Sequence, residues 1–163
     1  MQIRTATEAD WPRIWPFFDA VVKAGDSYAF PLDLDAESAR GWWMETPPGR
    51  TTVAVDHDGV VVGSAKMGPN RPGRGAHVAT ASFMVDPSAR RGEIGRALGE
   101  DMIAWARAEG FHGIQFNAVV ETNTAAVRLW RELGFDVVGT VPEAFDHATD
   151  GLVGLYVMHL PLA

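Results

Sequence analysis

The sequence predicts an α/β fold in which helices cover both faces of a mixed sheet. Apolar segments with strand patterning alternate with segments of helical patterning in the order strand, two helices, three strands, helix, strand, helix, two strands. No internal repeat, low-complexity tract or long linker divides the 163 residues, and that length suits a single core. We therefore expect one domain over residues 1–163.

The N-terminal quarter predicts a short strand followed by two helices. Ile3 to Thr5 has strand character, and the capping-box residues 7–10 precede a helix that ends at Gly25. Asp35 is a suitable N-cap for a second helix, which should end before Pro47.

The remaining elements alternate between the two periodicities. His57-Asp58-Gly59 is a hairpin signal between two apolar strands, and the residues from Pro69 to Gly75 predict an irregular loop. Gly110 and Gly134 are expected to end the last two helices. The expected strands are 51–55, 60–67, 77–85, 114–120, 135–141 and 152–160, and the expected helices are 95–109 and 123–134.

The composition excludes several classes of protein. No run approaches the roughly 18 apolar residues of a membrane helix, and the N-terminus has no basic-then-apolar signal, so we expect a cytoplasmic protein without a membrane partner. A net charge of −7 argues against nucleic acid as the main partner. The absence of cysteine excludes disulfides, a cysteine nucleophile and thiolate metal sites, and we expect no metal.

The segment from Arg90 to Leu98 is the most informative part of the chain. A strand ends at Asp86-Pro87, two arginines follow, and a helix is expected to start at Gly95. Unpaired N–H groups and the positive end of a helix dipole would then meet at one place, which suits a pyrophosphate. The spacing fits neither a P-loop nor a dinucleotide fingerprint. An ordinary strand-to-helix turn with solvated arginines is the alternative.

A second motif follows about thirty residues later. It runs from Asn123 to Trp130, and Gly134-Phe135 closes it. Ala126 and Leu129 share one helical face, which packing alone would explain. Asn123 is more informative, because it can cap the helix or reach a ligand.

Together the two motifs resemble the GCN5-related N-acetyltransferases, whose patterns are Arg/Gln-x-x-Gly-x-Gly/Ala and Asn-x-x-Ala-x-x-Leu-Tyr followed by Gly-Phe. The resemblance covers about residues 78–141 well and implies a mostly antiparallel sheet of about seven strands, splayed in the middle, with acetyl-CoA as cosubstrate. It implies that acetyl-CoA contacts Phe83, Met84, Val85, Arg90, Arg91, Gly92, Glu93, Ile94, Gly95, Arg96 and Asn123.

Three positions depart from the family pattern. Glu93 replaces the first glycine, which is tolerable if its side chain faces solvent. Trp130 replaces a tyrosine that protonates the leaving thiolate in many relatives, and an indole N–H cannot deliver that proton. Relatives of the phosphinothricin acetyltransferase type carry a glutamate where Thr80 falls, so we expect water or the amine itself to handle the proton.

A narrower resemblance concerns the acceptor. His77 to Phe83 and Phe116 to Asn123 are similar to a fungal group that acetylates azetidine-2-carboxylate and other proline analogues. The expected substrate-binding residues are Tyr28, Phe30, Thr80, Asn117 and Phe145. The expected catalytic residues are Asn117, Thr80 and Met84, near which backbone N–H groups would polarise the thioester. Trp42 and Trp43 are further aromatic candidates, although core packing would explain them equally well.

The resemblance therefore implies an N-acetyltransferase that acts on the amine of a small molecule, such as an amino acid or proline analogue, by direct attack in a ternary complex. A detoxifying role would follow from that substrate class. The alternatives are a protein N-terminal or lysine acetyltransferase, which needs an open groove, and a non-catalytic CoA-binding module. The family also implies a possible homodimer through the last strands.

Overall fold

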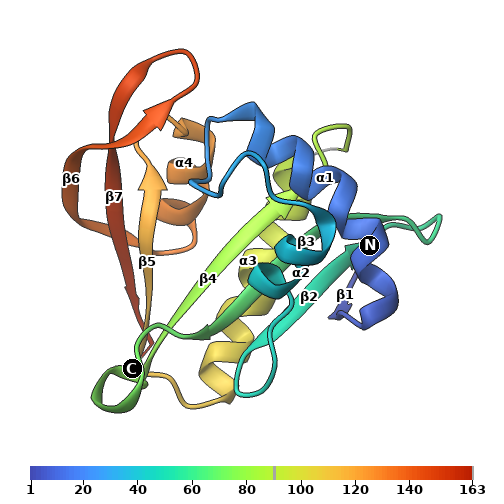
Figure 1. The fold of residues 1–163 in the computed structure, drawn as a ribbon. Helices are drawn as coiled ribbons and strands as arrows, with labels where there is room; N and C mark the ends of the chain where they lie inside the picture. Colours follow the sequence, from blue (N-terminus) through green and yellow to red (C-terminus); the bar gives the residue numbers. More distant parts are fainter. Residues whose placement is uncertain (90, 163) are drawn as a thin grey trace.

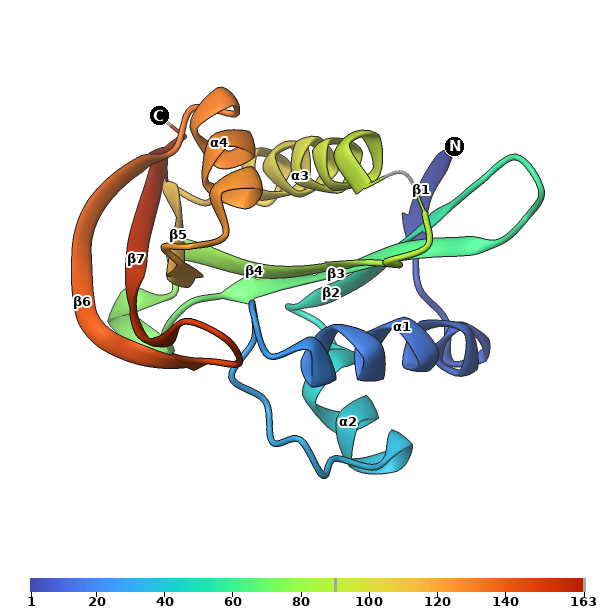
Figure 2. The same ribbon diagram turned by 90° about the horizontal axis from the view of Figure 1, so that it is seen from above.

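The structure is a computed structural model that describes residues 1–89 and 91–162. A seven-stranded sheet has the order β1-β2-β3-β4-β5-β7-β6. Helices α1 and α2 cover one face and α3 and α4 cover the other, as the edge-on view in Figure 2 shows. The elements are β1 (Gln2–Thr5), the 3-10 turn η1 (Glu8–Asp10), α1 (Trp11–Ala24), α2 (Ala36–Trp43), β2 (Arg50–Val55), β3 (Val61–Pro69), the 3-10 turn η2 (Gly73–Gly75), β4 (Val78–Val85), α3 (Arg91–Ala108), β5 (Gly113–Val120), α4 (Thr124–Glu132), β6 (Asp136–His147) and β7 (Gly151–Pro161).

The predicted fold class and the order of the elements are confirmed, and the two largest differences in bounds concern α3 and β6. Helix α3 begins at Arg91 rather than at Gly95, because the buried Ile94 anchors its first turn against Gly63 of β3. Strand β6 continues to His147 rather than ending near Val141, because its second half pairs with β7 as far as Gly151.

The sheet opens between β4 and β5. These parallel strands pair only at Val78 with Gly113 and at Ala79 with Ile114, and they then diverge (Figure 1). All other strand pairs are antiparallel. From residue 80 to residue 85, β4 is therefore paired with β3 alone.

An aromatic cluster lies on the α3/α4 side of the diverging strands. The Trp130 ring of α4 lies 4.7 Å from the Phe83 ring of β4 and 4.8 Å from the Phe116 ring of β5, centroid to centroid. Phe135 stacks on Phe116 at 4.3 Å. One buried indole thus contacts both strands, and its bulk supports their separation.

The opposite face has its own core, formed mainly by α1, α2 and the strands beneath them. Trp43 is fully buried there and its indole N–H donates to Ser64 Oγ at 2.9 Å. The Ser64 hydroxyl in turn donates to the Thr52 carbonyl at 2.7 Å. Trp43 is therefore a core residue, as its alternative interpretation predicted.

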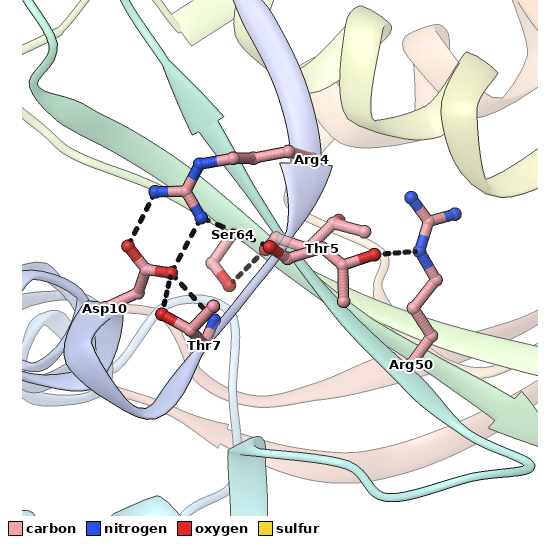
Figure 3. Close-up of polar contacts among 7 residues, drawn as sticks. Arg4, Thr5, Thr7, Asp10, Arg50 and Ser64 are labelled. Carbon is pink, nitrogen blue, oxygen red and sulfur yellow. Dashed lines mark hydrogen bonds and ion pairs between the residues drawn. The ribbon is translucent and has the colours of Figure 1, made fainter.

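A buried carboxylate fixes the start of α1 to the edge strand (Figure 3). Asp10 accepts two hydrogen bonds of 2.8 Å from the Arg4 guanidinium and a third of 2.8 Å from the Thr7 N–H. Hydrogen bonding to Arg4 is the main reason why the pKa of Asp10 lies far below its ordinary value. Removing either partner would leave a charge without its counterion.

Helix α4 packs very closely on α3 at Gly99. A Cβ at this position would lie 2.8 Å from the Leu133 side chain and 3.0 Å from the Trp130 ring. Gly95, one turn earlier, would place a Cβ 3.3 Å from Leu129. The two glycines therefore let α4 approach α3 closely enough for the Trp130 indole to pack against the sheet.

Among the residues that the structure describes, no helix is long and apolar enough to cross a membrane.

Candidate functional site

The edge of β4 that faces the gap offers main-chain hydrogen-bonding groups from alternate residues. Both the N–H and the C=O of Phe83 point into the gap, where each lies within hydrogen-bonding distance of a side-chain hydroxyl that belongs to neither β3 nor β4. The Asp86 N–H points the other way and donates to Val62 of the preceding hairpin at 2.9 Å. Because the direction alternates along an antiparallel strand, Val85 faces the gap with Phe83, whereas Met84 pairs with Ser64 of β3.

This alternation corrects the expectation for Met84. Its main-chain N–H belongs to the ladder with β3, and its side chain is 2% exposed in the α1/α2 core. The main-chain N–H groups that face the gap here are those of Phe83 and Val85. The register against β3 decides which residues of β4 face the gap.

The side chain that contacts the β4 edge is Tyr28, from the segment between α1 and α2. Its hydroxyl oxygen lies 2.7 Å from the Phe83 nitrogen and 2.6 Å from the Phe83 oxygen. Burial raises the pKa of Tyr28 to about 12 and outweighs hydrogen bonds to Phe83 and Ser82 that favour the phenolate. The phenol is therefore neutral at physiological pH.

The N-terminus of α3 follows the end of β4 after a tight turn. Asp86 accepts hydrogen bonds from the N–H and the hydroxyl of Ser88, at 2.8 and 2.7 Å, so the chain reverses within a few residues. Helix α3 then starts at Arg91, and the N–H groups of its first turn lack partners within the helix. The expected anion site is thus a helix N-terminus beside the open end of the gap.

The charged residues of this segment differ in their positions. Arg90 lies outside the described residues. The side chain of Glu93 is exposed, as the tolerance of this departure requires. The guanidinium of Arg96 is paired with Glu132 of α4 and lies 4.0 Å from Glu100, so its charge is partly balanced within the protein.

Asn123 is the N-cap of α4. Its Oδ1 accepts a hydrogen bond from the Ala126 N–H at 3.3 Å, so the interpretation as a cap is confirmed. The cap holds the asparagine at the end of β5 and orients α4 with Trp130 toward the gap. Trp130 therefore fills the place of the expected tyrosine as a packing residue.

A small cavity lies on the α1/α2 side of the sheet, over β3 and β4. It measures 240 Å³ and is bounded by the loop after α2 and by the adjoining parts of β3 and β4. Thr80 and Ser82 lie on its β4 wall, and Glu45 and Lys66 bring one charge of each sign. The Lys66 ammonium donates to the Trp42 carbonyl at 2.7 Å and lies 3.5 Å from a Glu45 oxygen.

Asn117 lies across the gap on the same side of the sheet. It occupies an irregular position where the pairing of β5 with β7 shifts register between Phe116 and Val119. Its amide donates to Asn70 Oδ1 at 2.7 Å, and its own Oδ1 accepts from Gln115 at 2.9 Å. The structure thus places Thr80 and Asn117 on the two strands that border the gap.

The aromatic residues expected to bind substrate separate into two groups. Phe30 stacks on Tyr28 with 5.9 Å between ring centroids, and the exposed Trp42 contacts its edge. Phe145 is different: it lies in β6, beyond the expected end of that strand, and it is buried with Val120 and Val153. Its expected substrate contact is therefore replaced by packing.

Sequence reasoning missed Glu45 and Lys66. Neither residue stands in a recognisable motif, and they come together only because the loop after α2 folds back over β3. The one available signal was the presence of a charged residue, Lys66, in the mostly apolar strand β3.

Comparisons with known proteins agree with this geometry. Residues 11–135 match the model of the acetyltransferase (GNAT) family. N-acetyltransferase aca1 of Schizosaccharomyces pombe is 35% identical over 142 residues, which are 78% of this chain and 68% of that protein. L-methionine sulfoximine/L-methionine sulfone acetyltransferase of Pseudomonas aeruginosa is 32% identical over 149 residues, or 86% of this chain and 83% of that protein.

Solved structures extend the likeness to the whole fold. A GCN5-related N-acetyltransferase from Kribbella flavida is 63% identical, with a TM-score of 0.96 over 99% of this chain and 97% of that chain. The yncA protein of Salmonella typhimurium, solved with its cofactor acetyl-CoA, is 26% identical, with a TM-score of 0.86 over 100% of this chain and 94% of that chain. The chain belongs to the acetyltransferase (GNAT) family and is an acyltransferase with acetyl-CoA as its cosubstrate.

Proposed function

We propose that this enzyme acetylates the amine of a small zwitterionic molecule, an amino acid or a proline analogue. The observation that carries the proposal is the 240 Å³ cavity over β3 and β4, in which Lys66 and Glu45 lie together. Pockets for drug-sized ligands measure about 300–1,000 Å³, so this cavity suits a smaller molecule. The relative that acetylates L-methionine sulfoximine supports the same class.

In this proposal the acetyl end of acetyl-CoA pairs with the gap-facing edge of β4. Phe83 and Val85 supply main-chain groups to the acetyl group and pantetheine, and Asn123 borders the pantetheine arm. The N–H groups of Arg91, Gly92 and Glu93 bind the pyrophosphate at the start of α3. The open strand edge and the adjacent helix N-terminus together fit an extended ligand with an anionic end.

The acceptor amine attacks the acetyl carbonyl from the cavity side. A nitrogen–carbon bond forms, the carbon–sulfur bond breaks, and the proton lost by the amine is balanced by the one that the thiolate gains. Lys66 binds the acceptor's carboxylate, and Glu45 holds its ammonium group. Through water, Glu45 takes the first proton from the ammonium group and so leaves the neutral amine that attacks. Glu45 thus supplies the carboxylate that is missing at Thr80.

An amine panel tests the proposal. Thiol release from acetyl-CoA should be fastest with amino acids and proline analogues, and the corresponding amines without a carboxylate should react poorly. Lys66→Met should raise KM for the acceptor at least tenfold and leave the acetyl-CoA affinity unchanged. Turnover of peptides alone would instead indicate a protein acetyltransferase, and CoA binding without turnover of any amine would indicate a binding module.

A homodimer is a further part of the proposal. Val138, Val141 and Leu152 on β6 and β7 are at least half exposed, which supports contact through the last strands. Light scattering after gel filtration measures the oligomeric state directly. A cytoplasmic location and a detoxifying role stay predictions from the sequence.

A further inference from the structure

The Tyr28 hydroxyl occupies a chemically specific point in the gap. It is within hydrogen-bonding distance of both main-chain groups of Phe83, at 2.7 and 2.6 Å, although the two residues are 55 positions apart in the chain. Because β5 has already diverged at this height, no strand partner is available to these groups. The hydroxyl oxygen therefore lies where an acceptor oxygen from a ligand would meet the Phe83 N–H.

Several contacts hold the ring of Tyr28 near this position. Its ring stacks on Phe30, which in turn packs against Phe18 of α1 with 5.3 Å between ring centroids. The start of the same segment is fastened to the β6–β7 turn, where the Ala148 N–H donates to the Gly25 carbonyl at 2.9 Å. The position of the hydroxyl thus depends on packing against α1 and on the β6–β7 turn as well as on β4.

We infer that Tyr28 is a catalytic residue whose O–H, together with the Phe83 N–H, donates a hydrogen bond to the carbonyl oxygen of the acetyl thioester. The inference rests on the proposed placement of the acetyl group at Phe83. When the thioester oxygen takes the position beside the Phe83 N–H, the tyrosine oxygen moves away from that N–H by about the length of one hydrogen bond. Its O–H then turns from the Phe83 carbonyl to the thioester oxygen. Two donors then converge on one atom.

The chemistry requires donors at this atom. When the amine attacks, the carbonyl oxygen gains negative charge, and donors that are already positioned lower the barrier. Tyr28 donates only a hydrogen bond, so the proton balance of the transfer is unchanged. Its high pKa, a consequence of burial, keeps the O–H present over the whole working range of pH.

Infrared spectroscopy of bound acetyl-CoA labelled with ¹³C at the acetyl carbonyl tests the inference without turnover. The labelled carbonyl stretch should lie at lower frequency in the wild-type complex than in water, and Tyr28→Phe should move it back toward the value in water. Tyr156→Phe is the matched control, because Tyr156 is the other of the two tyrosines and lies on β7. It should leave the band in place.

Kinetics give the second measurement. Tyr28→Phe should lower kcat roughly 10- to 100-fold, because one of two donors is lost, with the acetyl-CoA Kd unchanged within about threefold and the shape of the kcat–pH profile preserved. Tighter acetyl-CoA binding with unchanged kcat and carbonyl frequency would overturn the inference and make Tyr28 a displaceable plug. A band that is unshifted in both wild type and Tyr28→Phe would also overturn it, whereas no acetyl-CoA binding to wild type would refute the proposed placement of the cosubstrate itself.

Discussion

Replacing Trp130 with alanine should cost this protein much of its stability and narrow the gap between β4 and β5, where we propose that the cosubstrate binds. The indole is 7% exposed and contacts the rings of Phe83, Phe116 and Phe135. A tryptophan buries about 150–250 Å², which at about 25 cal/mol per Å² corresponds to roughly 4–6 kcal/mol of burial. Partial collapse of the emptied site lowers this figure, so we expect a loss of about 3–5 kcal/mol in the free energy of unfolding.

The assay is urea unfolding followed by far-UV circular dichroism, with acetyl-CoA binding measured by calorimetry. Trp42→Ala is the matched control, because that side chain is 53% exposed and its loss should cost under about 1 kcal/mol. Trp130→Phe should retain part of the support and lose about 1–2 kcal/mol. A loss for Trp130→Ala no larger than that for Trp42→Ala would refute the idea that the indole supports the diverging strands.

Three further predictions concern other parts of the fold. Asp10→Asn should destabilise the protein by about 2 kcal/mol at pH 7, below the cost for a fully buried pair because the Arg4 side chain is 37% exposed. Since the folded-state pKa of Asp10 is depressed, the stability that its charge contributes is present above the ordinary pKa and is lost as pH falls through the folded-state pKa. In denaturant titrations between about pH 5 and 2, the stability of the variant should therefore decline less steeply than that of the wild type. Gly99→Ala should lower the melting temperature, because the new Cβ meets side chains at 2.8 and 3.0 Å, whereas Gly41→Ala in open space should raise it by removing a helical glycine; equal shifts in calorimetry would contradict this. Asn117→Ala should raise the acceptor KM severalfold with no change in acetyl-CoA Kd, and steady-state kinetics that show the reverse pattern would place the amide on the cosubstrate instead.

Local signals account for most of the fold that sequence reasoning recovered. Gly25, Gly110 and Gly134 adopt positive φ angles at or just after the ends of α1, α3 and α4, where each was expected to stop a helix. Asp35 caps α2 as expected, by accepting a hydrogen bond from the Ser38 N–H at 2.8 Å. Such signals are readable because a cap or a helix stop depends on the residue itself and its immediate neighbours.

The bounds that were missed depend on distant contacts. Helix α3 starts early because Ile94 finds space above Gly63, and no residue within the helix announces that space. Phe145 belongs to β6 because β7 continues to pair beside it. In both places the competing local interpretation, a loop, was reasonable until a partner far away in the sequence decided otherwise.

Short motifs were enough to identify the family, the order of the elements and the segment in which a helix N-terminus follows β4, since the residues of each motif lie close together in the chain. That Phe83 rather than Met84 faces the gap follows from the register against β3, which no short motif records. The tertiary structure also brought Tyr28 to the β4 edge and Glu45 beside Lys66, across separations of 55 and 21 positions. Contacts of that range are set by how helices and loops pack on the sheet, and no local pattern in the chain records them.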